Sequence, residues 1–239
     1  MAVKPRIILT RERERNRVWA DLLTAAGLSV LELPLVRFEA LPVPEDFDSA
    51  AFDWILFTSP QGVQAFHDAG LDPGAARLAG LSEGTAAALA AVGWQDALSL
   101  QTRDGVEFAQ AFLAVIQEPG RVLLPGPRRR MSEPRATLTT AGCEVRELAL
   151  YETLPVEKLP ADPVAPGDIV FFCSPSTVRT FIGAWDDRPR CVAIGETTAD
   201  TARAAGFATD VALSPDLDAM VKAAGLDPYL KTAKPESES

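Results

Sequence analysis

The chain has 239 residues, of which 47% are hydrophobic and 23% are charged, a composition typical of a folded globular protein with room for two domains. Its formal net charge of −10 argues against a general nucleic-acid-binding protein, because that function needs a basic face. No apolar run approaches the roughly 20 residues that span a bilayer, and the N-terminus carries no recognisable signal peptide. We therefore expect a cytoplasmic protein that contacts neither nucleic acid nor membrane.

Apolar, β-branched segments alternate with alanine-rich helical segments along the chain. The segments predicted as strands are, in order, 6–10, 29–33, 54–58, 77–81, 97–100, 121–124, 144–148, 168–173, 191–194 and 209–213. Between the first two, apolar residues from Val18 to Ala26 recur at helical spacing and end at Gly27. Short connections between alternating strands and helices predict parallel sheets covered on both faces. The polar segment 231–239 lacks apolar anchors and is predicted to be a disordered tail.

The second half of the sequence repeats the first in one register. Arg6-Ile7-Ile8-Leu9 corresponds to Arg121-Val122-Leu123-Leu124, an offset of 115 (121 − 6 = 115), and Phe57-Thr58-Ser59-Pro60 corresponds to Phe172-Cys173-Ser174-Pro175 at the same offset. Further on, Glu83-Gly84-Thr85-Ala86 corresponds to Glu196-Thr197-Thr198-Ala199, now 113 residues apart (196 − 83 = 113). A shared register over several segments indicates an internal duplication, and therefore two similar domains.

Two proline-rich stretches, 33–44 and 151–166, interrupt the repeat at equivalent points. Proline has no backbone N–H to donate, so both stretches are interpreted as extended connectors rather than helices. We expect the chain to cross between the domains there.

Serine, threonine and glycine follow several predicted strands where the next helix begins. In parallel α/β sheets ligands bind beyond the carboxyl ends of the strands, where helix N-termini offer N–H and hydroxyl donors to anions. The residues placed in such turns are Ser59, Gly62 and Thr85 in the first copy and Ser174, Ser176, Thr197 and Thr198 in the second. The alternative interpretation, helix capping by a hydroxyl side chain, is the simpler one for any single turn.

Cations also follow the first strand of each copy. Thr10 and Arg11 come after segment 6–10, and Arg128, Arg129 and Arg130 occupy the matching position after segment 121–124. In an acidic protein this placement predicts a negatively charged ligand. Ordinary solvated arginine is the alternative, and we retain only Arg11 as a ligand-binding candidate.

The patterns of common reactive sites are missing from the sequence. There is no G-x-G-x-x-G or P-loop motif, no zinc or EF-hand pattern, and no C-x-x-C pair among the cysteines, so we expect neither a cofactor nor a metal. The single histidine, His67, is expected on a helix surface, and Glu83 and Glu196 are interpreted as first-turn helix acids. An enzyme of this kind would work by binding and positioning.

Taken in order, these segments resemble the uroporphyrinogen-III synthase family over roughly residues 6–224. The segments are Ile8-Leu9-Thr10-Arg11, Phe57-Thr58-Ser59-Pro60-Gln61-Gly62-Val63, Glu147-Leu148-Ala149-Leu150-Tyr151-Glu152-Thr153, Phe172-Cys173-Ser174-Pro175-Ser176-Thr177-Val178 and Ala193-Ile194-Gly195-Glu196-Thr197-Thr198-Ala199. The chain departs from the family at Gln61, where asparagine is common, and in the looser Ser82-Glu83-Gly84 turn.

The resemblance implies an α/β fold of two similar parallel-sheet, flavodoxin-like domains joined by a two-stranded connector. Residues 1–37 and 153–230 would form one discontinuous domain and residues 38–152 the other, so that the first strand–helix unit packs with the C-terminal half.

The activity implied is that of a cofactor-free lyase of haem and tetrapyrrole synthesis, which cyclises hydroxymethylbilane to uroporphyrinogen III. Loss of water gives an azafulvene cation, a spiro intermediate follows, and the last ring is inverted before closure. Tyr151 matches the tyrosine that the family places in its cleft, where it would help the hydroxyl to leave; packing of a linker residue is the alternative. The residues that would bind substrate carboxylates are Thr10, Arg11, Ser59, Gly62, Thr85, Ser174, Ser176, Thr197 and Thr198.

We expect a monomer with transient contact to the preceding enzyme of the pathway. The alternative function is a non-catalytic two-domain protein that binds a tetrapyrrole or another polyanion.

Overall fold

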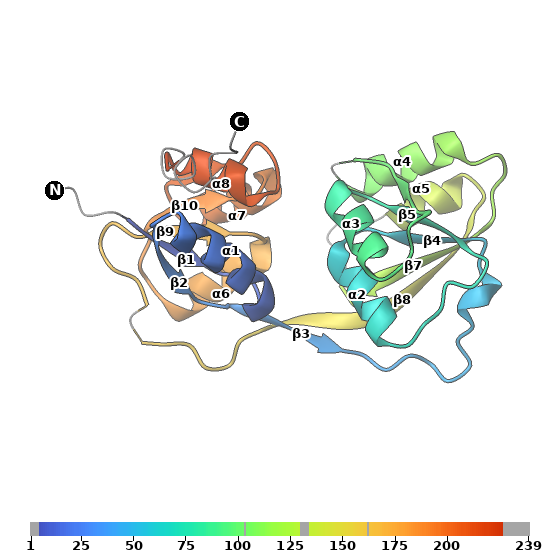
Figure 1. The fold of residues 1–239 in the computed structure, drawn as a ribbon, viewed down its shortest axis with the longest axis horizontal. Helices are drawn as coiled ribbons and strands as arrows, with labels where there is room; N and C mark the ends of the chain where they lie inside the picture. Colours follow the sequence, from blue (N-terminus) through green and yellow to red (C-terminus); the bar gives the residue numbers. More distant parts are fainter. Residues whose placement is uncertain (1–4, 103, 130–133, 162, 227–239) are drawn as a thin grey trace, which may run out of the picture. The chain divides into compact units, whose positions relative to one another are not determined.

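The computed structural model describes residues 5–102, 104–129, 134–161 and 163–226, so the predicted tail 231–239 lies outside the described residues. The chain divides into two compact units, of which unit 1 takes the residues up to Phe38 and from Leu154 onward and unit 2 takes Glu39–Thr153. Each unit is an α/β layered structure around its own, largely parallel sheet (Figure 1). This confirms the fold class predicted from the alternating pattern.

Unit 1 contains a five-stranded parallel sheet. Its strand order is β2 (Ser29–Glu32), β1 (Arg6–Leu9), β9 (Ile169–Phe172), β10 (Arg190–Ala193) and β11 (Thr209–Val211). β1 lies between β2 and β9, with Ile7 opposite both Val30 and Ile169. A parallel sheet buried on both faces needs continuous apolar strands, and β9 is accordingly the buried run Ile-Val-Phe-Phe.

Helices cover both faces of this sheet. Ile7 and Leu9 point into one core with α1 (Arg13–Ala25) and α8 (Leu217–Ala223). Ile8 points into the opposite core with α6 (Pro175–Ala184) and α7 (Glu196–Ala204). The two-residue period of a strand therefore distributes one apolar run between two helix layers.

Unit 2 contains a six-stranded sheet. Its order is β3 (Val36–Ala40), β8 (Glu144–Pro155), β7 (Arg121–Pro127), β4 (Trp54–Phe57), β5 (Arg77–Gly80) and β6 (Leu98–Ser99). The helices of the unit are α2 (Pro60–Asp68), α3 (Glu83–Ala91), α4 (Gly105–Val115) and α5 (Pro134–Thr140), with a 3₁₀ turn at Ser49–Ala51. β7, β4, β5 and β6 are parallel neighbours, and β8 is parallel to β7.

β3 and β8 connect the units. The amide of Leu41 donates to Leu150 and the amide of Val156 donates to Leu35, so the two strands run antiparallel. The proline-rich stretches were predicted as extended connectors, and the structure pairs parts of both as the strands β3 and β8; β8 continues to Pro155, whereas the predicted strand ended at residue 148. Prolines are tolerated here because they lie outside β3 and at the last residue of β8.

Each sheet combines strands from both repeats. At the repeat offsets, β1 and β2 correspond to β7 and β8, whereas β4, β5 and β6 correspond to β9, β10 and β11. β1 pairs with β9, and β7 pairs with β4, so the first two strands of each repeat join the last three strands of the other. The strand pairing thus shows the exchange that the family resemblance implied.

Within the described residues, no helix has both the length and the apolar character required to cross a membrane.

Candidate functional site

In unit 2 the carboxyl ends of β4, β5 and β7 bring several of the predicted residues together. Ser59 caps α2 by accepting a hydrogen bond from the Gly62 amide at 3.1 Å. Gly62 faces the end of β7 closely, since a Cβ atom there would lie 3.5 Å from the Pro125 carbonyl oxygen. A Cβ on Gly84, at the start of α3, would lie 3.9 Å from the Pro60 ring. The starts of α2 and α3 and the end of β7 therefore form one continuous edge.

At the start of α3, two hydroxyl side chains of the same turn bond to each other. Ser82 caps the helix by accepting from the Thr85 amide at 3.3 Å, and its oxygen lies 3.0 Å from Thr85 Oγ1. Thr85 is fully buried. Ser82, which was not among the predicted binding residues, is thus the hydroxyl of this turn that reaches the edge of the sheet.

In unit 1 the end of β1 is held by its neighbours. Thr10 is fully buried, and its hydroxyl donates to the Phe171 carbonyl of β9 at 2.7 Å. The backbone of Arg11 is bonded to the side chain of Asn16, and the Arg11 guanidinium lies 4.5 Å from the centre of the Trp19 ring. Arg11 itself is partly exposed. The predicted Thr10–Arg11 turn therefore presents the arginine, whereas the threonine anchors the turn.

The next strand of the same sheet, β9, leads into α6. Ser174 caps α6 by accepting from the Thr177 amide at 3.3 Å, and its oxygen lies 2.8 Å from Ser176 Oγ. Both serines are partly exposed. Cys173 precedes them, and burial raises the pKa of its thiol to about 12. This thiol is consequently protonated at neutral pH.

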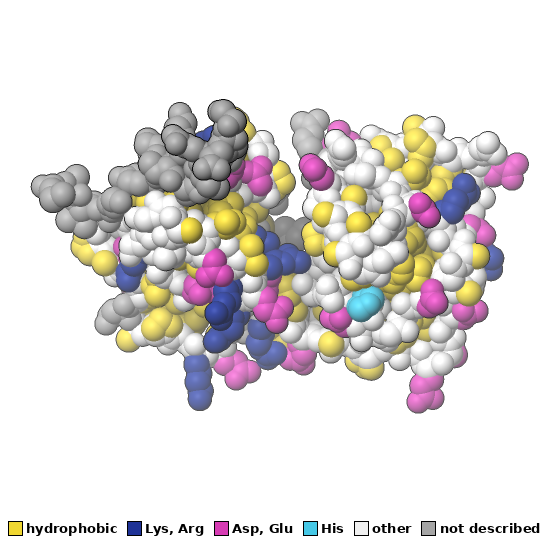
Figure 2. All heavy atoms as spheres, in the orientation of Figure 1, with side chains coloured by type: hydrophobic (Ala, Val, Ile, Leu, Met, Phe, Trp, Pro, Cys, Tyr) yellow, Lys and Arg dark blue, Asp and Glu magenta, His cyan; other side chains and the backbone are white. Residues whose placement is uncertain are grey.

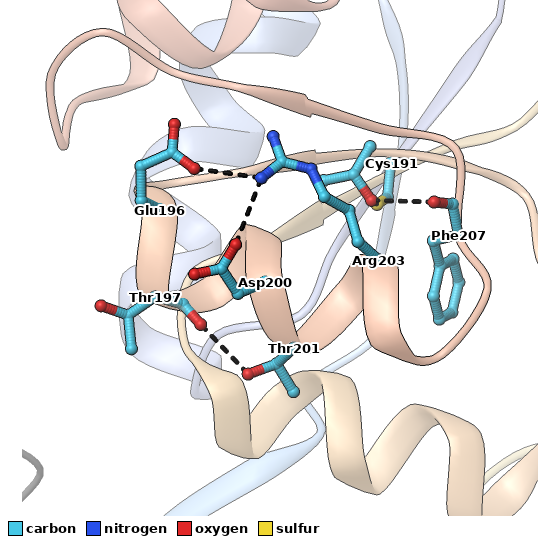
Figure 3. A network of polar contacts seen from close by, with 8 residues as sticks. Cys191, Glu196, Thr197, Asp200, Thr201, Arg203 and Phe207 are labelled. Carbon is cyan, nitrogen blue, oxygen red and sulfur yellow. Dashed lines mark hydrogen bonds and ion pairs between the residues drawn. The ribbon is translucent and has the colours of Figure 1, made fainter.

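The third turn of unit 1 opens α7 and differs from its counterpart in unit 2. Gly195 occupies the N-cap position, and among the described residues no side chain caps this helix. Glu196 pairs with Arg203 at 3.1 Å, and the Thr201 hydroxyl donates to the Thr197 carbonyl (Figure 3). Glu196 is thus a paired first-turn acid, as predicted. Thr197 is exposed and Thr198 is buried.

Tyr151 lies on β8, opposite Pro127 of β7, next to a β-bulge at Gly126 and Pro127. Its carbonyl accepts from the Arg128 amide at 2.8 Å, and its side chain is 6% exposed. The residue sits two positions before the chain leaves unit 2.

The cations predicted after β7 are differently placed. Arg128 pairs with Glu152 at 2.9 Å, Arg129 is exposed, and Arg130 lies outside the described residues. On the face drawn in Figure 2, Lys and Arg side chains gather over the part of unit 1 that carries α1. The single histidine, His67, lies on the exposed side of α2, as predicted.

Sequence reasoning missed Asn16, which is fully buried and organises the β1–α1 turn. A signal was present, because asparagine is unfavourable inside a helix unless its amide bonds to nearby backbone.

Comparisons with known proteins agree on one family. The family model described as "Uroporphyrinogen-III synthase HemD" matches residues 17–222. The chloroplastic uroporphyrinogen-III synthase of Oryza sativa subsp. japonica is 27% identical over 85% of this chain and 74% of that protein. The porphyrin biosynthesis protein HemD of Ruminiclostridium josui is 25% identical over 90% of this chain, which spans about half (47%) of that protein.

Solved structures show the same fold. Uroporphyrinogen-III synthetase from Helicobacter pylori is similar with a TM-score of 0.67 and 19% identity, over 93% of this chain and 98% of that chain. A mutant uroporphyrinogen III synthase from Thermus thermophilus has a TM-score of 0.58 and 21% identity, over 95% of this chain and 99% of that one.

Proposed function

Because the chain belongs to the uroporphyrinogen-III synthase family, we propose that it cyclises hydroxymethylbilane to uroporphyrinogen III with inversion of the last ring. The observation that carries this function is the family match over residues 17–222. That range includes the starts of α2, α3, α6 and α7 at the carboxyl ends of the two sheets, where a parallel α/β protein binds its ligands; the β1–α1 turn precedes it.

Substrate carboxylates are bound at these helix starts. Hydroxyl groups and backbone amides at a helix N-terminus favour an anion, and among the residues predicted to bind, Ser59, Ser174, Ser176 and Thr197 have partly or fully exposed hydroxyls there. Arg11 adds a guanidinium, which binds carboxylate through two parallel hydrogen bonds.

Four predicted residues act indirectly. Thr10, Thr85 and Thr198 are buried at the same turns, and Gly62 at the start of α2 lies beside the end of β7. They set the shape of the edge, while the exposed groups bind.

The reaction needs little from reactive side chains. Loss of the hydroxyl of hydroxymethylbilane as water leaves an azafulvene cation, which the substituted carbon of the last ring attacks to give the spiro intermediate. The bond from that carbon to its original bridging carbon then breaks, the last ring turns over, and its unsubstituted α-carbon closes the macrocycle with release of one proton, which balances the proton taken up when water leaves. The contribution of the protein is to hold the flexible substrate in the conformation in which that carbon attacks, which makes it a hydro-lyase without a cofactor.

Tyr151 assists the first step as a hydrogen-bond donor to the departing hydroxyl. Its phenolic O–H is a donor, and its position beside the β7–β8 bulge supports a role at the sheet edge. Its low exposure supports the alternative role of packing, and replacement by phenylalanine distinguishes the two.

We further propose that the protein is a cytoplasmic monomer that contacts the enzyme supplying hydroxymethylbilane only transiently. Cys143, Cys173 and Cys191 are free thiols, which suits a reducing compartment. Sedimentation analysis, alone and with the supplying enzyme, would measure both states; a stable dimer would contradict the proposal.

The test of function uses purified protein and freshly prepared hydroxymethylbilane, with the isomers separated by chromatography. Without a catalyst the substrate closes to the symmetrical type I isomer, whereas the protein should give type III. Type I alone, formed at the uncatalysed rate, would overturn the synthase function and leave a tetrapyrrole-binding protein.

A further inference from the structure

We propose that Asn16 and Trp19 are positioning residues for substrate binding, and that they act by holding Arg11 in a carboxylate-binding conformation. The inference rests on the proposed function, because it names residues that prepare one group of the same site.

Asn16 holds the backbone of Arg11 from both sides. Its Oδ1 accepts from the Arg11 amide at 3.0 Å, and its Nδ2 donates to the Arg11 carbonyl at 2.8 Å and to the Leu9 carbonyl at 2.9 Å. The amide is fully buried, and all three bonds go to the β1–α1 turn. One side chain thus holds the peptide groups on either side of Arg11.

The rest of the turn is equally constrained. The Thr10 carbonyl accepts from the Leu35 amide at 3.2 Å, in addition to the bond from the Thr10 hydroxyl to β9. The position of the Arg11 Cα is therefore determined by β9, by the segment after β2 and by Asn16.

Trp19 supports the far end of the same side chain. The Arg11 guanidinium carbon lies 4.5 Å from the centre of the Trp19 ring, which is 9% exposed and belongs to the core beneath α1. A cation over the face of an indole is attracted by the ring electrons without use of its N–H groups. The hydrogen-bond donors of the guanidinium therefore stay available.

Arg11 has no carboxylate partner among residues 5–102, 104–129, 134–161 and 163–226, although the chain carries 33 acidic residues. Arg15, which lies one helical turn away, is by contrast paired with Glu12 at 2.9 Å. An arginine whose backbone and side chain are both held, and whose guanidinium donors are not used by any described residue, is preorganised for an external carboxylate.

The test compares KM and kcat of variants with the wild type. Asn16→Ala and Trp19→Leu should raise KM for hydroxymethylbilane about tenfold with little change in kcat, because carboxylate binding far from the reacting carbon is uniform between substrate and transition state. Trp19→Phe keeps an aromatic face and should restore most of the affinity.

A matched control is available at the amino ends of the strands in the sheet of unit 2. Trp54 is 5% exposed, begins β4 and lies 4.2 Å below the Arg77 guanidinium. Trp54→Leu removes a comparable buried indole and cation contact, so it should lower the melting temperature without changing KM. A rise in KM equal to that of Trp19→Leu would overturn the inference.

A double-mutant cycle with Arg11→Met separates positioning from general structural damage. If Asn16 acts through Arg11, Asn16→Ala should not raise KM further once the guanidinium is absent; multiplicative effects of the two changes would overturn the inference. Should Asn16→Ala fail to fold, the same cycle is measured with Trp19→Leu and Arg11→Met.

Binding of the polycarboxylate uroporphyrin, followed by fluorescence, repeats the cycle without turnover. Formation of type I alone by the wild type would overturn the proposed function, while the binding cycle would still decide whether Asn16 and Trp19 act through Arg11. If the wild type forms type III but the effects of the two substitutions on uroporphyrin affinity multiply, the positioning role is overturned and the proposed function stays intact.

Discussion

Single residues at the carboxyl edges of the two sheets divide by exposure rather than by residue type. Thr10 and Thr85 are fully buried, and their hydroxyls bond to the Phe171 carbonyl of β9 and to Ser82, whereas Ser174 and Thr197 reach the surface. A buried hydroxyl that already has a partner contributes mainly to stability. Substitutions at the first group should therefore change stability first, and substitutions at the second group should change substrate affinity.

Replacing Tyr151 by phenylalanine tests the proposed hydrogen-bond donor to the departing hydroxyl. If the phenol assists departure of the hydroxyl, kcat should fall by about 10²-fold, the lower end of general-acid contributions, while KM stays near that of the wild type. The ring is kept, so the melting temperature should change little. Steady-state kinetics with the isomer ratio measure the effect, and unchanged turnover would assign Tyr151 to packing. Tyr229→Phe, at the only other tyrosine, serves as a control.

The thiols of Cys173 and Cys191 should be slow to alkylate. Burial raises the pKa of Cys173 to about 12 and that of Cys191 to about 11, and only the thiolate reacts. At pH 8 we expect iodoacetamide to modify Cys173 at least about 10²-fold more slowly in the folded protein than in urea. Mass spectrometry of the modified peptides gives each rate, and equal rates in both states would contradict the prediction.

At the scale of elements, the repeated strand–turn–helix units differ in how the N-terminus of the helix is capped. Ser59, Ser82 and Ser174 cap α2, α3 and α6, whereas no side chain of the described residues caps α7. A helix start without a capping side chain leaves backbone amides for an external anion. α7 therefore leaves its first backbone amides to a carboxylate, as does α1, whose N-cap residue Glu12 also makes no capping bond within the described residues.

Ser174→Asp separates the capping role from the binding role. Aspartate caps a helix about as well as serine, so the unfolding free energy should stay within about 0.5 kcal/mol of the wild type. The new negative charge should repel a substrate carboxylate, and we expect KM to rise about tenfold. Denaturant unfolding and kinetics measure the two effects.

Asp104→Ser is the reverse exchange at the cap of α4, a helix start for which no substrate-binding residue is proposed. It should leave KM unchanged. An unchanged KM in Ser174→Asp as well would reduce Ser174 to a helix cap.

Sequence periodicity predicted ten of the strands at nearly their observed positions, but it missed β3 and the second half of β8. Arg6–Leu9, Trp54–Phe57 and Ile169–Phe172 are short apolar runs bounded by turn residues, which local pattern identifies well. Val36–Ala40 is a strand only because the antiparallel end of β8 lies beside it. Such pairing between distant segments has no local signal.

At the scale of the whole molecule, the exchange between repeats is accompanied by two equivalent ion pairs. Arg6 pairs with Asp168 at 2.6 Å in unit 1, and Arg121 pairs with Asp53 at 3.7 Å in unit 2. Both arginines and both aspartates are 115 residues apart (121 − 6 and 168 − 53). Each pair therefore joins the first strand of one repeat, β1 or β7, to the residue just before the corresponding strand of the other, β9 or β4.

Acid should weaken the unit 2 pair. The Asp53 carboxylate accepts the Arg121 amide at 2.7 Å, and this hydrogen bond, with the charge of Arg121, lowers the pKa of Asp53. A folded-state pKa below the unfolded value near 3.9 gives stability that is present above about pH 4 and lost as the pH falls through the folded pKa.

The unfolding free energies of wild type and Asp53→Asn should accordingly differ at pH 6 and converge toward pH 2. Urea unfolding across this range measures the difference, and Asp96→Asn, at an exposed position, is the control. A gap that stays constant with pH would contradict the role of the charge.

The sequence by itself determined the type and order of most elements, the duplication, and the family, because periodicity, capping residues and repeat register are local or self-comparing signals. The repeat pattern alone is equally compatible with each repeat closing its own sheet; only the family resemblance implied the exchange, and strand pairing shows it. Tertiary structure alone decided that Asn16 binds the Arg11 backbone and that Thr10 turns its hydroxyl toward β9. Those hydrogen bonds form between groups that come together only when the strands and helices pack. The linear sequence pattern carries no signal for such contacts.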